Sequence, residues 1–226
     1  MINERYKKNL GAFSQEEFVS LQEKSVFVVG CGGIGGCAIE TLARFGIGRL
    51  SIIDGDVFEE SNLNRQVFST EKNLGESKAL ATEAALKDIN SQISVSVWNE
   101  LLTEANAFDL MKGHDIVMDC LDNIPTRLLV ERTCENLGIP FVHGAISGFS
   151  GQVCSVFPGD RILQSIYPEQ YRGANREFSA PPFILQMVAA IQCSEALKIL
   201  TGKGEVLRQR LLMIDLLNNS FDIFQF

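Results

Sequence analysis

The stretch VFVVGCGGIGGCAIETLARFGIGRLSIID, residues 26–54, decides the fold. It opens with Val26–Val29, a short β-branched run that is typical of a buried parallel strand. The glycine motif Gly30–Gly35, a G-x-G-x-x-G, follows at once. A helical pattern and a second apolar strand come next, and that strand ends on Asp54. Strand, glycine turn, helix, strand and acid together predict a nucleotide-binding βαβ unit.

Each part of this unit has a chemical role in binding a nucleotide. Glycines such as Gly32, Gly33 and Gly35 let the backbone approach a phosphate, and the helix that follows offers free N–H groups to an anion. Asp54 can accept hydrogen bonds from ribose hydroxyls. The alternative for the glycines alone is a tight turn before a helix, but the strands and the acid favour nucleotide binding.

The rest of the chain continues the alternation of strands and helices up to residue 146, and the alternation is then lost. We expect an α/β fold, a doubly wound (Rossmann-like), mostly parallel sheet extended by antiparallel C-terminal strands. Helices are expected at 77–90, 104–111, 125–138 and 183–200, and strands at 93–98, 115–120, 140–146, 152–157, 210–216 and 220–226.

Two segments lie outside this pattern. Residues 1–24 form a polar helical arm with ragged apolar spacing, so we expect the arm to pack on a neighbouring subunit rather than on its own core. Residues 158–182 have no clear period and form a crossing loop; loops of that length are typically functional or mobile. We see no linker and no repeat, which predicts a single domain over residues 1–226.

Composition narrows the class of protein. Hydrophobic content of 46% and charged content of 21% indicate a globular chain. The formal charge of −8 gives no support to nucleic-acid binding. No uninterrupted apolar run is long enough to span a bilayer and the first residues resemble no signal peptide, so we expect a cytoplasmic protein without a membrane partner.

The six cysteines form no C-x-x-C pair, and most lie in apolar segments. We therefore expect reduced, buried thiols and no zinc site.

Polar side chains gather where strands are expected to end, which is where doubly wound sheets bind ligands. The groups are Asp54 with Asp56, Asp119 with Asp122, and the loop that carries Asn62, Asn64, Arg65 and Gln66. Carboxylates beside a nucleotide would repel its phosphates unless a cation such as Mg²⁺ lies between them. A nicotinamide oxidoreductase and an enzyme of ATP phosphate chemistry both remain open, although the cations Arg65 and Lys78 favour a triphosphate.

The motifs, taken in order, resemble one family. They are Gly30–Gly35, Asp54-Gly55-Asp56, SNLNRQ at 61–66, Gly75 with Lys78, and DCLDN at 119–123. The chain resembles the ThiF/MoeB/HesA family, the bacterial relatives of ubiquitin-activating enzymes, over nearly its whole length. We expect a short form of the family without the zinc cysteines: Ser165-Ile166-Tyr167-Pro168 stands near the position of the family's first zinc-binding cysteine pair, and the second pair is missing.

The resemblance implies a function. Family members use ATP and Mg²⁺ to adenylate the C-terminal glycine carboxylate of a small ubiquitin-like sulfur carrier that ends in Gly-Gly, and release pyrophosphate. The implied partners are that carrier, a separate sulfur donor and a second copy of the chain. The implied catalytic residues are Arg65, Lys78 and Asp122, with Asp122 on Mg²⁺; the implied nucleotide-binding residues are Gly32, Gly33, Gly35, Asp54, Asp56, Asn62, Arg65, Gln66, Lys78 and Lys8.

Lys8 stands where the family often carries an arginine that reaches the ATP of the partner subunit. A lysine keeps the charge but loses the bidentate fork. Two other functions stay open: a dehydratase that cyclises threonylcarbamoyl adenosine in tRNA, and a non-catalytic nucleotide-binding scaffold. Because no cysteine lies in the crossing loop, we also expect the acyl-adenylate to leave without a covalent intermediate.

Overall fold

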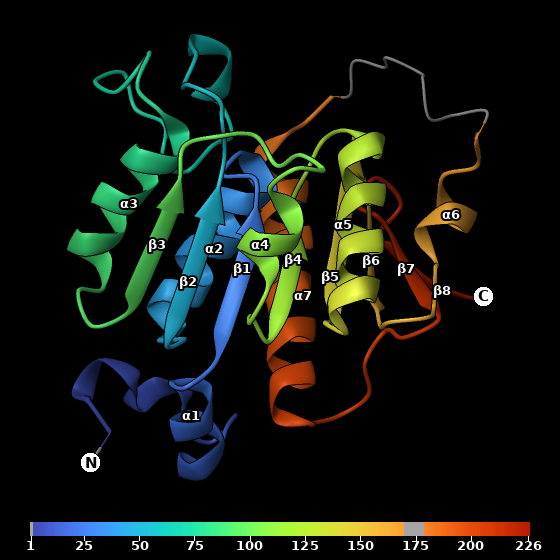
Figure 1. Ribbon diagram of the computed structural model, residues 1–226, viewed down its shortest axis with the longest axis horizontal. Coiled ribbons are helices and arrows are strands. Elements are labelled where there is room, and N and C mark those ends of the chain that lie inside the picture. The colour runs from blue at the N-terminus through green and yellow to red at the C-terminus, as the bar shows by residue number, and fades with distance from the viewer. Residues whose placement is uncertain (1, 170–178) are drawn as a thin grey trace.

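The computed structural model describes residues 2–169 and 179–226 and contains an eight-stranded sheet (Figure 1). The strand order is β3-β2-β1-β4-β5-β6-β7-β8. The strands are β1 (Ser25–Val29), β2 (Arg49–Ile53), β3 (Ser94–Trp98), β4 (Ile116–Asp119), β5 (Phe141–Ser147), β6 (Ser150–Val156), β7 (Arg210–Asp215) and β8 (Ser220–Gln225). The helices are η1 (Glu4–Asn9), α1 (Gln15–Leu21), α2 (Gly33–Phe45), η2 (Glu60–Asn62), α3 (Lys78–Ile89), α4 (Ala107–Met111), α5 (Ile124–Leu137), α6 (Leu163–Ile166) and α7 (Pro182–Thr201).

The pairing confirms the expected fold class. Strands β3, β2, β1, β4 and β5 run parallel, and β6, β7 and β8 continue the sheet in antiparallel pairs. All residues of β1 and β4 are buried, which explains their continuous apolar runs: a central parallel strand has helices on both faces.

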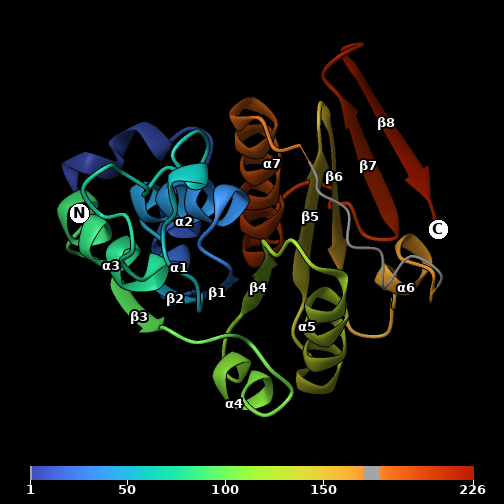
Figure 2. The same ribbon diagram turned by 90° about the horizontal axis from the view of Figure 1, so that it is seen from above.

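Helices cover the parallel part of the sheet from two sides, as the view from above shows (Figure 2). Helices α2, α3 and α7 pack into one apolar core, and α4, α5 and α6 pack into the other. This arrangement leaves the carboxyl ends of the parallel strands at one edge of the layer, where the glycine turn also lies.

Helix α7 is apolar along most of its length. In the described part of the chain it is the one helix that is long and apolar enough to cross a membrane, and half of the window that passes this test is buried inside the protein. It packs on α2, β5 and β6, and core helices of soluble proteins pass the same test.

The N-terminal arm packs on its own chain, so the expectation that it packs on a neighbour was wrong. Tyr6, Phe18 and Leu21 are buried, and the Phe18 ring lies 5.1 Å from that of Tyr6 and 5.6 Å from that of Phe45. Gly46 explains the fit, because a Cβ there would lie 2.4 Å from the Tyr6 ring. The ragged apolar spacing reflects two short helices in place of one.

Two expected segments differ from the structure by more than a shift of one or two residues at their ends. Helix α4 begins at Ala107 rather than at residue 104, because Asn106 accepts a hydrogen bond from the Thr103 N–H and closes a turn there. The crossing loop contains the short helix α6, which spans too few residues to show a period. Residues 170–178 of that loop lie outside the described residues.

Candidate active site

The glycine turn forms a cradle between β1 and α2. Gly30 has φ +97°, which favours glycine, and a Cβ on Gly35 would lie 1.8 Å from the Gly30 carbonyl oxygen. The N-cap of α2 is Gly32, which has no side chain to accept from the first N–H groups of the helix. These donors and the helix dipole make the turn a binding place for an anion such as a phosphate.

Asp54 ties the end of β2 to this turn. Its Oδ2 accepts from the Cys31 N–H at 2.7 Å and its Oδ1 from the Asp56 N–H at 2.8 Å. Burial raises the pKa of Asp54, and the two backbone hydrogen bonds only partly oppose that effect. Each carboxylate oxygen has a second lone pair, so Asp54 can still accept from a ribose hydroxyl.

The loop after β2 brings Gln66 to the glycine turn. The Gln66 Nε2 lies 3.7 Å from the position that a Cβ on Gly32 would take, and the side chain is 6% exposed. Within the described residues its Oε1 has no hydrogen-bond partner. Because a buried carbonyl oxygen without a partner costs free energy, this atom favours a hydrogen-bond donor at this place, from a ligand or from solvent.

Asn62 and Arg65 shape the same loop. Asn62 is buried, and its Oδ1 accepts from the Glu59 N–H at 3.0 Å. Arg65 is half-buried and donates through Nη1 to the Ser61 carbonyl at 2.6 Å and to the Asn64 Oδ1 at 2.9 Å. These contacts orient the guanidinium and leave other N–H groups available for phosphate.

Lys78 is the first residue of α3, and its side chain is held at the end of β2. It is 7% exposed, and its Nζ lies 3.0 Å from Oδ2 of the exposed Asp56. Helix dipoles disfavour a cation at this position, so the placement makes sense beside an anion. A ligand phosphate and Asp56 would therefore compete for or share the Lys78 ammonium.

Asp119 is not part of an open acidic cluster, so that sequence interpretation was wrong. It is fully buried, with Arg127 Nη1 at 3.5 Å and His143 Nδ1 at 2.7 Å from its Oδ2. Burial by itself would raise the pKa of Asp119, but Arg127 and His143 outweigh burial and hold that pKa below its usual range. The turn between β4 and α5 is thus built on an ion pair.

Asp122 is exposed in that turn, and its carboxylate is not the helix cap. Asn123 caps α5, because its Oδ1 accepts from the Thr126 N–H at 3.0 Å. An exposed carboxylate fits Mg²⁺, which typically takes one or two carboxylates together with substrate phosphates and waters. No group of three or more His, Cys, Asp or Glu in residues 2–169 and 179–226 could hold a metal.

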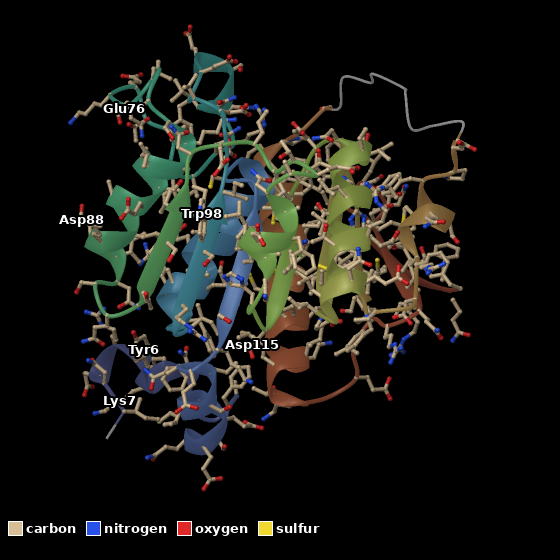
Figure 3. The ribbon with its side chains drawn as sticks, in the orientation of Figure 1. Tyr6, Lys7, Glu76, Asp88, Trp98 and Asp115 are labelled. Carbon is tan, nitrogen blue, oxygen red and sulfur yellow. The ribbon has the colours of Figure 1, made fainter. Side chains whose placement is uncertain are left out.

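Lys8 does not meet the nucleotide residues of its own chain. It is exposed on η1, and its neighbour Asn9 donates to the Phe45 carbonyl at the far end of α2 from the glycine turn. Figure 3 shows Tyr6 and Lys7 at the opposite end of the molecule from Glu76, which precedes Lys78 by two residues.

Sequence reasoning missed three residues that support the site. Arg127 is 5% exposed under the Asp122 turn, Gln192 donates to the Asp119 carbonyl at 2.9 Å, and Leu185 packs on Gly33. A charged side chain one helical turn after Asn123 was the available signal for Arg127. Gln192 and Leu185 come from α7, far away in the sequence, and no local pattern indicated them.

Comparisons with known proteins agree on one family. The family model described as "ThiF family" matches residues 6–226. The chain is 36% identical over 206 residues to the "SAMP-activating enzyme E1" of Haloferax volcanii, covering 89% of this chain and 76% of that protein. It is 37% identical over 206 residues to the mouse (Mus musculus) "Adenylyltransferase and sulfurtransferase MOCS3", covering 89% of this chain and 45% of that protein. The chain thus spans about half the length of such MOCS3 relatives.

Solved structures show the same fold. Escherichia coli MccB, solved with ATP, has a TM-score of 0.84 and 22% sequence identity, and the match covers 100% of this chain and 71% of that chain. MccB solved with MccA-N7isoASN has a TM-score of 0.87 at 22% identity, covering 99% and 72%.

Proposed function

The chain belongs to the ThiF family, and from this premise we propose that it transfers the adenylyl group of ATP to a carboxylate of a small ubiquitin-like carrier protein. A carrier carboxylate oxygen attacks the α-phosphorus of ATP, the bond from that phosphorus to the bridging oxygen breaks, and pyrophosphate leaves. The observation that carries the proposal is the buried Gln66 side chain, whose Oε1 has no hydrogen-bond partner among the described residues, beside the uncapped start of α2, with Lys78 and Arg65 on adjoining elements.

In this proposal, different residues of the site bind different parts of ATP. The glycine turn and the first N–H groups of α2 hold phosphate oxygens, and Asp54 accepts from the ribose. Arg65 and Lys78 neutralise charge that grows on the leaving pyrophosphate, and charge stabilisation of this kind is a major part of catalysis of phosphoryl and adenylyl transfer. Asp122 would hold Mg²⁺, and the metal would supply Lewis-acid charge stabilisation. No general base is required, because the attacking carboxylate is already ionised.

The finer proposal concerns the carrier and the sulfur. We propose a sulfur carrier that ends in Gly-Gly and a separate sulfur donor that attacks the free acyl-adenylate. Five of the six cysteines are buried. Burial raises the pKa of Cys31 and Cys120 well above the usual thiol value and the pKa of Cys193 to about 12, so these thiols are poor nucleophiles. Intact mass spectrometry after a reaction without reductant tests this step, and a thioester adduct on the chain would contradict it.

We further propose that the active form is a homodimer in which Lys8 of one copy reaches the phosphates of the other. The position of Lys8, far from its own glycine turn, supports a role between copies. Mixing a Lys8→Ala chain with an Arg65→Ala chain tests the idea, since mixed dimers would contain one intact site. Failure of the mixture to regain activity over the two separate variants would argue against it.

The decisive experiment is ATP–pyrophosphate exchange with the purified chain, Mg²⁺ and a carrier that ends in Gly-Gly. We expect exchange that requires the carrier and disappears when its last glycine is removed. Exchange driven by threonylcarbamoyl-modified tRNA would instead select the dehydratase, a function that the formal charge of −8 does not favour. Binding of ATP without exchange by any partner would select a non-catalytic scaffold.

A further inference from the structure

The backbone just before Asp122 is held at both of its polar groups. The Leu121 N–H donates to Oδ1 of Asp119 at 3.1 Å, and the Leu121 carbonyl accepts from Nη2 of Arg127. Residue 121 is therefore clamped between the two members of a buried ion pair. Any shift of Asp119 or Arg127 moves the turn that presents the Asp122 carboxylate.

His143 connects this ion pair to β5. A carboxylate only accepts, so the 2.7 Å contact between His143 Nδ1 and Asp119 Oδ2 places the proton on Nδ1. Burial lowers the pKa of His143, which keeps the ring neutral and makes Nε2 an acceptor. Arg127 Nη1 also lies 3.0 Å from Nδ1, but two donors do not bond, and Nη1 donates instead to the Gly144 carbonyl at 2.8 Å.

Tyr167 completes the chain of contacts from the crossing loop. Its Oη lies 3.2 Å from Nε2 of His143 and 2.9 Å from Nε2 of Gln152, which in turn lies 3.0 Å from the same histidine nitrogen. The hydroxyl can accept from Gln152 and donate to His143 at the same time. The Tyr167 ring also packs edge-on to His143 at 5.7 Å, with the Arg127 guanidinium 5.8 Å from its centre.

We propose that Tyr167 is a positioning residue for the Mg²⁺ ligand Asp122, acting through His143, Asp119 and Leu121. By donating to Nε2 it keeps the His143 proton on Nδ1 and facing Asp119, which keeps the Leu121 clamp closed. The part of the crossing loop next to α6 thereby controls the affinity of the site for the metal–nucleotide complex. This inference rests on the proposed function, because it takes Asp122 as the metal ligand.

The test compares two tyrosine variants in nucleotide binding. Tyr167→Phe removes the hydroxyl from the chain of contacts. Tyr6→Phe is the matched control, since the buried Tyr6 hydroxyl accepts from the Asn90 side chain at 2.8 Å at the opposite end of the molecule. The probe is a non-hydrolysable ATP analogue, whose dissociation constant is measured with Mg²⁺ and with chelator, together with the melting temperature of each variant.

For Tyr167→Phe we expect binding of the analogue to weaken about tenfold with Mg²⁺, the order seen when groups behind a metal ligand are changed, and to stay unchanged with chelator. Tyr6→Phe should lower the melting temperature by a similar amount and leave both constants unchanged. Gln152→Met removes the N–H that donates to the Tyr167 hydroxyl and orients its proton toward His143 Nε2, so this variant should act in the same direction as Tyr167→Phe.

The experiment distinguishes failure of the proposed function from failure of the proposed role of Tyr167. A wild-type chain whose nucleotide binding ignores Mg²⁺ would contradict the proposed function itself. A wild-type chain that responds to Mg²⁺, together with a Tyr167→Phe variant that responds equally, would overturn only the role of Tyr167. Equal weakening with Mg²⁺ and with chelator would also overturn it, because that pattern reports general loosening of the site.

Discussion

The two ends of the parallel sheet are both polar, but their polar groups are used differently. At the amino end, Asn90 donates to the Tyr6 hydroxyl at 2.8 Å and to the Ala43 carbonyl at 2.7 Å, and Asp115 accepts from the Ser25 N–H and hydroxyl and from Lys24. At the carboxyl end, the described residues leave the Gln66 Oε1 without a partner and the start of α2 without a side-chain cap.

The comparison teaches where a ligand belongs. Buried polar groups in a folded protein are almost always hydrogen-bonded, so the amino end needs nothing more to be stable. The carboxyl end keeps donors and acceptors that only a ligand or solvent can satisfy. Substitutions of the bonded groups at the amino end, such as Asn90, should therefore change mainly stability, and substitutions of the exposed groups at the carboxyl end, such as Asp122, should change mainly binding and catalysis.

The largest effect on stability is expected from substitution of Asp119. This residue is an exception to the division between the two ends of the sheet. It lies at the carboxyl end but is fully buried against Arg127. Asp119→Ala leaves that guanidinium buried without its charge partner, which typically costs about 3–5 kcal/mol of unfolding free energy. Urea unfolding of the variant and the wild type measures the loss. A loss below about 1 kcal/mol would show that the pair behaves like an exposed salt bridge.

The next largest effect is expected from Asp122 and Arg65, and on the rate instead of the stability. Loss of one charge-assisted contact in such a site costs about 2–4 kcal/mol, a hundredfold or more in rate. Asp122→Asn and Arg65→Ala should each lower ATP–pyrophosphate exchange by that factor, while their unfolding free energies stay within about 0.5 kcal/mol of wild type. Wild-type exchange in either variant would remove that residue from the mechanism.

Local patterns were sufficient for most of the fold. The glycine turn and the period of the helices were visible in the sequence, and the helix expected at residues 125–138 ends at its C-cap Gly138. The arm was misplaced because its packing depends on the absence of a Cβ at Gly46, which no local pattern shows.

The candidate site was predictable only in part. Side chains next to the glycine turn in one βα unit, such as Asp54 and Gln66, could be named from the sequence because strand ends meet at one edge of a sheet. The burial of Asp119 and the roles of Arg127 and Tyr167 depend on contacts between α5, β5 and the crossing loop. Such contacts join residues whose spacing along the chain carries no signal.

A smaller effect is expected at the amino end. Asn90→Ala removes the donor to the Tyr6 hydroxyl and to the Ala43 carbonyl, and buried groups left without a partner cost about 1–3 kcal/mol. We expect a loss of that order in unfolding free energy and unchanged affinity for ATP, measured by calorimetric titration. Weaker ATP binding by a variant that is still folded would show that the two ends are coupled.

The smallest effect, and the one that sharpens the comparison most, is the pH dependence of stability at two strand-end carboxylates. Arg127 and His143 hold the pKa of Asp119 below 3.8 despite its burial, whereas burial raises the pKa of Asp54 above 3.8. A lowered pKa in the folded state adds stability that is present above the ordinary pKa and lost as the pH falls through the folded pKa. A raised pKa has the opposite sign: the stability is present below the ordinary pKa and lost as the pH rises through the folded pKa.

The unfolding free energies of Asp119→Asn and Asp54→Asn, each compared with wild type between pH 2 and pH 7, should therefore move in opposite directions. As the pH rises through the region below 3.8, the deficit of Asp119→Asn should grow and then level off. As the pH rises above 3.8, the deficit of Asp54→Asn should shrink, because the wild type then has to ionise a partly desolvated carboxyl that the variant lacks. Parallel pH profiles for the two variants would mean that the two carboxylates have equivalent environments. That result would contradict the distinction between Asp119, which is paired inside the protein, and Asp54, which faces the nucleotide site.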